Sequence, residues 1–169
     1  ACAVGGAVVF PTDRHTASIA DAVEKNRCTI LHSVPTMFRV LLAREAFPNR
    51  DFSSLRTAII GGAYCPPADF VKIENALGIR LLSSLGQTEC TAGLTVGNYD
   101  DPIEIRSTTL GHFMNHVQGK IVNHKTGEEM PNGQVGEICV KGYLVMQGYY
   151  NEPELTKKVI DENGWLHTG

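Results

Sequence analysis

Apolar residues follow two spacings in the first half of the chain, and the alternation between them predicts strands and helices in turn. Short apolar runs bounded by glycine, proline or polar residues are typical of buried strands, whereas apolar residues three and four positions apart are typical of helices. The predicted strands are 7–10, 29–31, 56–60 and 79–82. The predicted helices are 16–26, 35–42 and 66–77. This β-α-β-α-β-α-β order predicts an α/β fold, a parallel sheet with flanking helices.

The second half of the chain has a different pattern, with short β signals and dense turns. Alternating apolar and polar residues predict strands at 119–122 and 135–140, and turn-forming residues cluster at 123–127 and 131–133. Residues 153–159 are expected to form a short polar helix. We therefore expect two subdomains, an α/β subdomain over 1–105 and a small β-rich subdomain over 106–169.

Composition narrows the class of protein. The chain has 169 residues and a formal net charge of −3, which argues against a nucleic-acid partner. No apolar run approaches the 18 residues of a membrane span, so no transmembrane segment is expected. Five cysteines, with no Cys-x-x-Cys pair, favour reduced thiols and a cytoplasmic location. Both ends look like cuts into a longer chain, with neither a signal nor a transit peptide.

Two loops follow consecutive predicted strands and are candidates for ligand binding. Gly61-Gly62-Ala63 follows the third strand, and 84–89 follows the fourth. In open α/β sheets, ligands bind at the carboxyl ends of the strands. Paired glycines let a flat ring or a phosphate approach the backbone closely. The alternative is that the glycines only form the turn from strand to helix.

Thr88-Glu89 offers a hydroxyl next to a carboxylate, a pair that suits a phosphate oxygen and a bridging Mg²⁺ ion. The alternative is a helix start, with Thr88 as the cap and Glu89 in the first turn. His112 and His116 are four residues apart, but a third ligand is not evident, so no zinc site is expected there. The usual phosphate-binding patterns, GxxxxGK[ST] and GxGxxG, do not occur.

Three stretches, in order along the chain, together resemble the adenylate-forming, AMP-binding enzyme superfamily. The first, 53–66, contains Gly61-Gly62-Ala63. The second, 85–90, is similar to the family's Tyr-Gly-x-Thr-Glu. The third runs from 136 through 146–150 to 164–169, and resembles the segment that leads into the family's Thr-Gly-Asp. Within the superfamily, the third stretch looks most like an acyl-CoA synthetase, a fatty-acid–CoA ligase.

The resemblance implies a reaction in two halves. A carboxylic acid and ATP form an acyl-adenylate and pyrophosphate with Mg²⁺, and coenzyme A then displaces AMP to give an acyl-CoA thioester. The implied catalytic residues are Thr88, which would bind the α-phosphate, and Glu89, which would hold Mg²⁺. The implied nucleotide-binding residues are Gly61, Gly62, Ala63, Leu85, Gly86, Gln87 and Thr88.

Two features qualify the resemblance. The family usually has an aromatic residue where Leu85 stands, and an aromatic ring can stack on adenine whereas leucine offers only an apolar face. The phosphate loop, the ribose-binding Asp and the C-terminal domain with its catalytic Lys would lie outside this chain, so the chain alone is expected to be inactive and to depend on the rest of the same enzyme. The alternatives are an aryl-acid or amino-acid adenylating enzyme, or a non-catalytic scaffold of the same fold.

Overall fold

The computed structural model describes residues 2–45, 47–91 and 93–169, and these fold into two compact units. Unit 1 comprises Ala1–Ser84 and Gly97–Gly111, and unit 2 comprises Leu85–Val96 and His112–Gly169. The units are therefore interleaved along the chain. The predicted subdomains, 1–105 and 106–169, are each one continuous segment, unlike these units. They stay a prediction about the domains of the whole protein.

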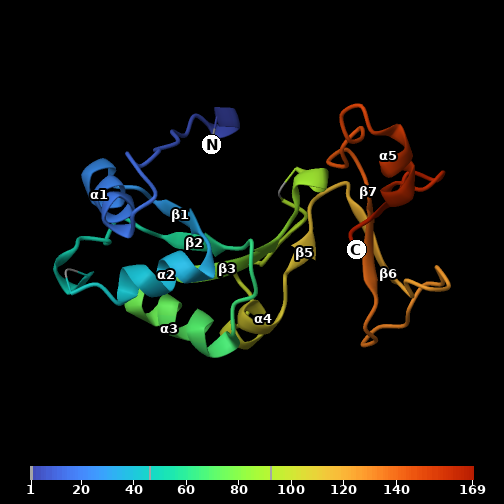
Figure 1. The fold of residues 1–169 in the computed structure, drawn as a ribbon. Coiled ribbons are helices and arrows are strands. Elements are labelled where there is room, and N and C mark those ends of the chain that lie inside the picture. The colour runs from blue at the N-terminus through green and yellow to red at the C-terminus, as the bar shows by residue number, and fades with distance from the viewer. Residues whose placement is uncertain (1, 46, 92) are drawn as a thin grey trace. The chain divides into compact units, whose positions relative to one another are not determined.

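A parallel sheet with helices against it forms unit 1 (Figure 1). Three strands pair in the order β1-β2-β3: Ile30–Ser33, Thr57–Ile60 and Arg80–Leu85. The helices are α1 (Thr16–Asn26), α2 (Pro35–Leu42), α3 (Pro67–Leu77) and α4 (Ile103–Thr108), with single 3₁₀ turns η1 (Cys2–Val4) and η2 (Phe47–Asn49). Helix α2 packs against both α1 and α3. The predicted parallel sheet with flanking helices is thus confirmed.

Local sequence signals explain where these helices begin and end. Pro35 and Pro67 each occupy the first turn, where the missing N–H has no intrahelical partner to lose. Helix α3 ends at Gly78, whose left-handed backbone (φ 65°) lets its N–H reach the carbonyl of Glu74. Helix α1 ends the same way at Arg27, a non-glycine residue in the left-handed region.

Apolar side chains from the sheet and the helices share one core in unit 1. Ala58 and Leu81 on the central strands are fully buried, and Phe38, Phe70 and Ile73 from α2 and α3 pack in the same cluster. This burial stabilises the sheet because each side chain of this size removed from water contributes about 1.5–3 kcal/mol.

A buried ion pair links three elements of unit 1. The Arg106 guanidinium on α4 donates to both carboxylate oxygens of Glu74 on α3, and it also donates to the Leu81 carbonyl on β3. The Glu74 carboxylate accepts the Leu81 N–H as well, at 2.7 Å. Burial alone would raise the pKa of Glu74, but the bonds from Arg106 and Leu81 outweigh it and lower that pKa.

Unit 2 is rich in short antiparallel strands. β4 (Thr95–Val96) pairs with β5 (His112–Phe113), and a second sheet has the order β6-β7-β8: Gln118–Val122, Glu137–Lys141 and Leu166–His167. The helical segments are η3 (Thr88–Cys90) and α5 (Pro153–Val159). Cys90, Leu94, Val140, Leu144 and Leu166 form its buried core. The β-rich character predicted for the second half is confirmed.

One predicted strand is wrong. Residues 7–10 form no strand, and Val8 and Phe10 are exposed. A four-residue apolar run specifies no pairing partner, and the paired strands of unit 1 start with β1. Pro11, which follows directly, has no N–H to donate to a ladder.

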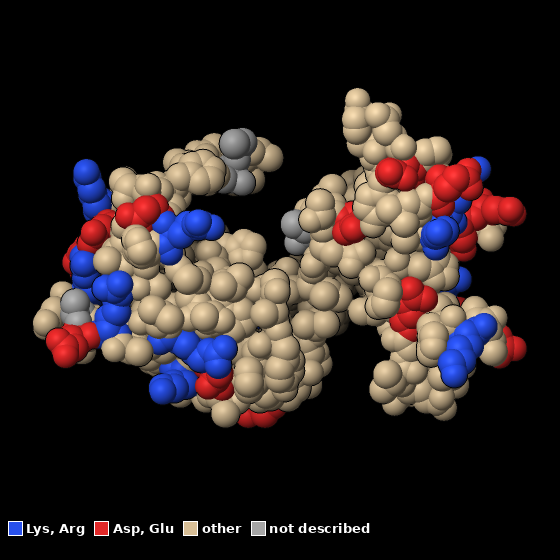
Figure 2. Space-filling model, viewed as in Figure 1, with Lys and Arg blue, Asp and Glu red and all other residues tan. Residues whose placement is uncertain are grey.

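Charges of both signs are intermixed over each unit on the face drawn in Figure 2, as the small net charge suggests. Among the described residues, none of the helices is long and apolar enough to cross a membrane.

Candidate active site

The predicted loop after β3 folds back along its own strand and is held by hydrogen bonds, most of them between backbone groups. The Leu85 carbonyl accepts the Leu94 N–H at 2.8 Å, and the Leu85 N–H reaches the Thr95 hydroxyl at 3.3 Å. At the far end of the turn, the Gln87 carbonyl accepts the Cys90 N–H at 3.0 Å. The loop is therefore a fixed turn within unit 2.

This loop forms one wall of a pocket of about 320 Å³ that lies entirely within unit 2. The lining residues are Leu85, Gly86, Gln87, Leu94, Gly136, Ile138, Thr168 and Gly169. The volume is at the lower end of the ~300–1,000 Å³ usual for small-molecule sites. Apolar side chains and bare glycine backbone make up most of the lining, which suits a flat ring.

The opposite wall comes from strand β7 and the end of the chain, and hydrogen bonds fix it in place. Thr168 donates both its N–H and its hydroxyl to the Ile138 carbonyl, at 3.1 and 2.9 Å. The Gly169 N–H donates to Glu137 Oε1 at 2.9 Å. A side chain at Gly136 would meet the Val122 carbonyl oxygen at 2.5 Å, so this position requires glycine.

Glu89 lies just beyond the pocket loop, in η3, with a partner that orients its carboxylate. The Tyr149 hydroxyl donates to Glu89 Oε1 at 2.7 Å, and the Met146 N–H donates to the Glu89 carbonyl at 2.8 Å. The hydroxyl of Thr156 in turn accepts the Tyr149 N–H at 2.9 Å. The hydrogen bond from Tyr149 lowers the pKa of Glu89, so the carboxylate is ionised at neutral pH.

An ionised carboxylate that accepts the Tyr149 hydroxyl and its own backbone N–H retains lone pairs for a cation. Mg²⁺ takes one or two carboxylates together with waters and substrate phosphates, and Glu89 fits that requirement. The neighbouring Thr88 directly follows the pocket loop in sequence, and its side chain is exposed. The helix-start alternative is confirmed in part: η3 begins at Thr88 and has Glu89 in its first turn, but its cap residue is Gln87, which makes no side-chain cap bond.

A family model described as "AMP-binding enzyme" matches residues 1–150. The chain belongs to the AMP-binding enzyme family. Two curated relatives are the acyl-CoA ligase sidI of Aspergillus fumigatus, 38% identical over 98% of this chain and 29% of that protein, and the mitochondrial medium-chain acyl-CoA ligase ACSF2 of Danio rerio, 34% identical over 98% of this chain and 28% of that protein. The chain thus spans less than a third of the length of these AMP-binding enzymes.

Two solved structures share the fold. The amide bond synthetase McbA from Marinactinospora thermotolerans matches with a TM-score of 0.87 and 32% identity, over 99% of this chain and 33% of that one. ATP-bound MatB from Rhodopseudomonas palustris matches with a TM-score of 0.80 and 28% identity, over 95% of this chain and 31% of that one.

The residues implied by the resemblance fall into separate groups in the structure. Leu85, Gly86 and Gln87 lie together in the pocket wall, and Thr88 and Glu89 follow them directly in η3. Gly61, Gly62 and Ala63 lie in unit 1.

Close backbone packing requires glycine at the start of that unit 1 loop. A side chain at Gly61 would come within 2.8 Å of the Ser84 carbonyl oxygen, and Gly62 has a left-handed backbone (φ 77°). The strand-to-helix turn thus accounts for both glycines. Their contact with a ligand stays a prediction.

Sequence reasoning missed two parts of the site. Gly136, Ile138, Thr168 and Gly169 belong to motifs of the family resemblance, but the sequence does not indicate that they form one wall of a pocket. Tyr149, the partner of Glu89, was also missed, since the two residues are 60 positions apart. A Gly-Tyr-Tyr sequence at 148–150 was the signal present, but it does not reveal which ring meets the carboxylate.

Proposed function

We propose that this chain carries the nucleotide pocket and one metal ligand of an ATP-dependent acid–CoA ligase. The observation that carries the proposal is the pocket in which the Leu85–Gln87 loop faces Gly136, Ile138 and the Thr168–Gly169 segment. Two motifs of the resemblance line one cavity, although about 50 to 80 residues separate them in sequence. The whole enzyme would contain this chain as one part, and the chain alone would not complete the reaction.

In the first half-reaction, a carboxylate oxygen of the acid attacks the α-phosphorus of ATP. The new O–P bond forms the acyl-adenylate, and the bond to pyrophosphate breaks. The pocket would receive the adenine between the Leu85–Gly86 backbone and the Gly136–Ile138 wall. The apolar contact of Leu85 would replace the stacking that an aromatic side chain provides in other family members.

Thr88 and Glu89 would act on the phosphates. The Thr88 hydroxyl is exposed next to the pocket loop and is proposed to donate to an α-phosphate oxygen. The Glu89 carboxylate is proposed to hold Mg²⁺, which when bound neutralises charge on the phosphates. Tyr149 would keep the Glu89 carboxylate in one orientation and ionised. Such placement of charge is how enzymes assist reactions that need little covalent help from the protein.

In the second half-reaction, the thiol of coenzyme A attacks the acyl carbon of the adenylate. A C–S bond forms, the C–O bond to the phosphate breaks, and AMP leaves. The names of both acyl-CoA ligase relatives support an acyl group and coenzyme A as substrates, and the word medium-chain in the name of ACSF2 supports a fatty acid. An aryl acid or an amino acid is the alternative acid, and a non-catalytic scaffold is the alternative class. The four described free cysteines support the cytoplasmic location proposed from the sequence.

The proposal is tested by acyl-CoA formation with the whole enzyme, ATP, Mg²⁺, coenzyme A and a panel of fatty acids, aryl acids and amino acids. We expect thioester with medium- or long-chain fatty acids. Glu89→Gln should lower kcat by roughly 10²–10³-fold, as expected when one charge-stabilising group is removed. The control Glu154→Gln, an exposed carboxylate on α5 paired with Lys157, should leave the rate unchanged. Full activity of Glu89→Gln would remove the metal assignment, and thioester from aryl acids alone would change the substrate class.

A further inference from the structure

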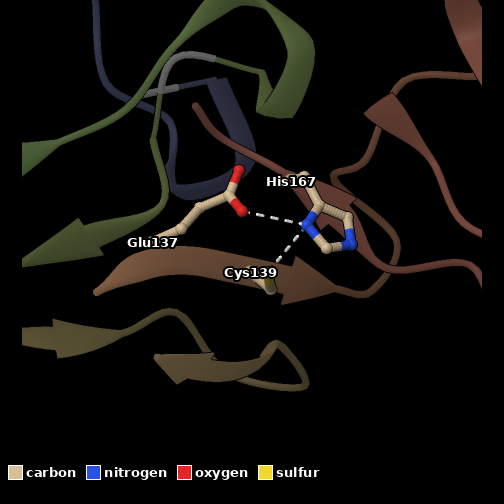
Figure 3. Close-up of side chains that lie close together, drawn as sticks. All are labelled: Glu137, Cys139 and His167. Atoms are coloured by element: carbon tan, nitrogen blue, oxygen red, sulfur yellow. Dashed lines mark hydrogen bonds and ion pairs between the residues drawn. The ribbon is translucent and has the colours of Figure 1, made fainter. Parts of the chain in front are cut away.

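Three side chains of types that can bind a metal ion lie close together on the β6-β7-β8 sheet of unit 2. The adenylation reaction proposed above assigns no role to this group of three. They are Glu137, Cys139 and His167 (Figure 3). One potential ligand atom from each residue lies within 4.8 Å of the others. We propose that these three residues form a binding site for a thiophilic divalent cation, zinc above all.

Strand register brings the three side chains together. Glu137 and Cys139 are two residues apart on β7, so both point to the same face of the sheet. His167 on β8 is the direct antiparallel partner of Cys139. Directly opposed residues in a sheet have neighbouring side chains on one face. The cluster therefore rests on two hydrogen-bonded strands, which position ligands more firmly than loops do.

The separations are close to those that zinc imposes. Bonds of about 2.3 Å to sulfur and about 2.0–2.2 Å to nitrogen and oxygen at tetrahedral angles place the ligand atoms about 3.4–3.6 Å apart. His167 Nδ1 lies 3.3 Å from Cys139 Sγ and 3.1 Å from Glu137 Oε2. Both of these pairs need to open by only a few tenths of an ångström to admit the ion, and the third pair, Glu137 with Cys139, lies within 4.8 Å.

The donor set selects among metals. Sulfur, imidazole nitrogen and one carboxylate oxygen suit zinc, whereas Mg²⁺ and Ca²⁺ require oxygen ligands. This site is chemically distinct from the Mg²⁺ role proposed for Glu89, which offers oxygen only. Three protein ligands leave the fourth tetrahedral position for water.

Neighbouring groups lie beside two of the ligands. Asp161 Oδ2 is 3.8 Å from the other ring nitrogen of His167, Nε2, which is longer than a hydrogen bond. When an ion binds Nδ1, Nε2 carries the proton and this carboxylate is placed to accept it after a small shift. Glu137 uses its Oε1 for the Gly169 N–H, so Oε2 is the oxygen that remains for the metal. Cys139 is fully buried, and the His167 side chain is 33% exposed, which gives an ion access from the imidazole side.

The competing explanation is a metal-free hydrogen-bonded pair. In that case His167 donates its Nδ1–H to Glu137 Oε2, and the Cys139 thiol lies beside the same nitrogen without a bond to a metal. The two explanations differ in the role of sulfur, because only the metal site requires a thiolate bond. A test that detects the metal–sulfur bond therefore separates them.

Co²⁺ is the probe, since cobalt bound to a thiolate produces a near-ultraviolet charge-transfer absorption and zinc displaces it. We expect one equivalent of Co²⁺ to give this band with the purified whole protein, and Zn²⁺ to abolish it. Cys139→Ser should lose the band. Cys90→Ser is the matched control: Cys90 is equally buried in unit 2, its thiol donates to the Gln87 carbonyl, and its loss should leave the band intact.

Two further variants keep the test decisive if the serine substitution disturbs folding. Zinc affinity measured by calorimetry should fall at least about tenfold in His167→Gln, a lost ligand, and about 10–100-fold in Asp161→Asn, which orients that ligand. Absence of the cobalt band in folded wild-type protein would overturn the proposal. A band that persists in Cys139→Ser, or affinities unchanged in both other variants, would overturn it equally.

Discussion

The buried ion pair between Arg106 and Glu74 provides the sharpest stability prediction, made with Arg106→Met. The arginine side chain is 3% exposed and the glutamate 13%, so the substitution leaves a carboxylate with little access to water. Methionine also removes the donor to the Leu81 carbonyl. Removing one partner of a buried pair costs about 3–5 kcal/mol, a large share of a typical ~5–15 kcal/mol stability.

The double variant Glu74→Leu/Arg106→Met separates the cost of leaving the Glu74 carboxylate buried without a partner from the cost of the other lost contacts. Both charges are gone, both variants lack the donor to the Leu81 carbonyl, and the loss specific to the double variant is the Leu81 N–H left without its acceptor, about 1–3 kcal/mol. The double variant should therefore be more stable than Arg106→Met by about 2 kcal/mol. A control, Glu154→Leu, removes an exposed ion pair and should cost no more than about 1 kcal/mol.

Urea unfolding followed by far-ultraviolet circular dichroism measures these differences. Trp165, the single tryptophan, lies in unit 2, so its fluorescence shows whether the loss is confined to unit 1. A loss below about 1 kcal/mol for Arg106→Met, or a double variant less stable than the single one, would refute the view that this pair is desolvated and links α3, β3 and α4.

Three other predictions follow from single contacts. Gly61→Ala should destabilise the protein by about 1–3 kcal/mol in urea unfolding, because its Cβ would lie 2.8 Å from the Ser84 carbonyl oxygen; an unchanged midpoint would contradict that packing. The pKa of Glu74 in the folded protein is lowered below its ordinary 4.5. Its contribution to stability is therefore present above about pH 4.5 and is lost as the pH falls through the folded pKa. A urea midpoint that stays constant down to pH 3 would contradict the lowered pKa. Tyr149→Phe should raise the pKa of Glu89 toward 4.5 in a carboxylate NMR titration. An unchanged pKa would show that the Tyr149 hydroxyl does not bond to this carboxylate in solution.

Helices of this chain could be predicted from the sequence because their signals are local. The predicted bounds 16–26 and 35–42 agree with α1 and α2, and the proline and glycine at the ends of α3 mark its limits. Strands were less well defined. β3 continues to Leu85, beyond the predicted end at 82, because the polar Ser83 and Ser84 still belong to the strand even though they break the apolar run.

Of the candidate site, only the loop that directly follows β3 could be predicted from the sequence. Leu85, Gly86 and Gln87 come directly after β3, so their position follows from the general geometry of α/β sheets. The facing wall comes from β7 and the end of the chain, and its position depends on the pairing of β6, β7 and β8. Pairing between distant segments leaves no local pattern in one sequence, which is also why the Glu137–Cys139–His167 cluster was not foreseen.

ATP–pyrophosphate exchange by the whole enzyme is the direct test of adenylation, because it reports the adenylation step without the thiol. We expect exchange that requires Mg²⁺ and a carboxylic acid, that is strongly reduced in Glu89→Gln, and that is retained in Glu154→Gln. Absence of exchange with every acid tested, by folded enzyme that still binds ATP, would contradict adenylation and favour a non-catalytic scaffold.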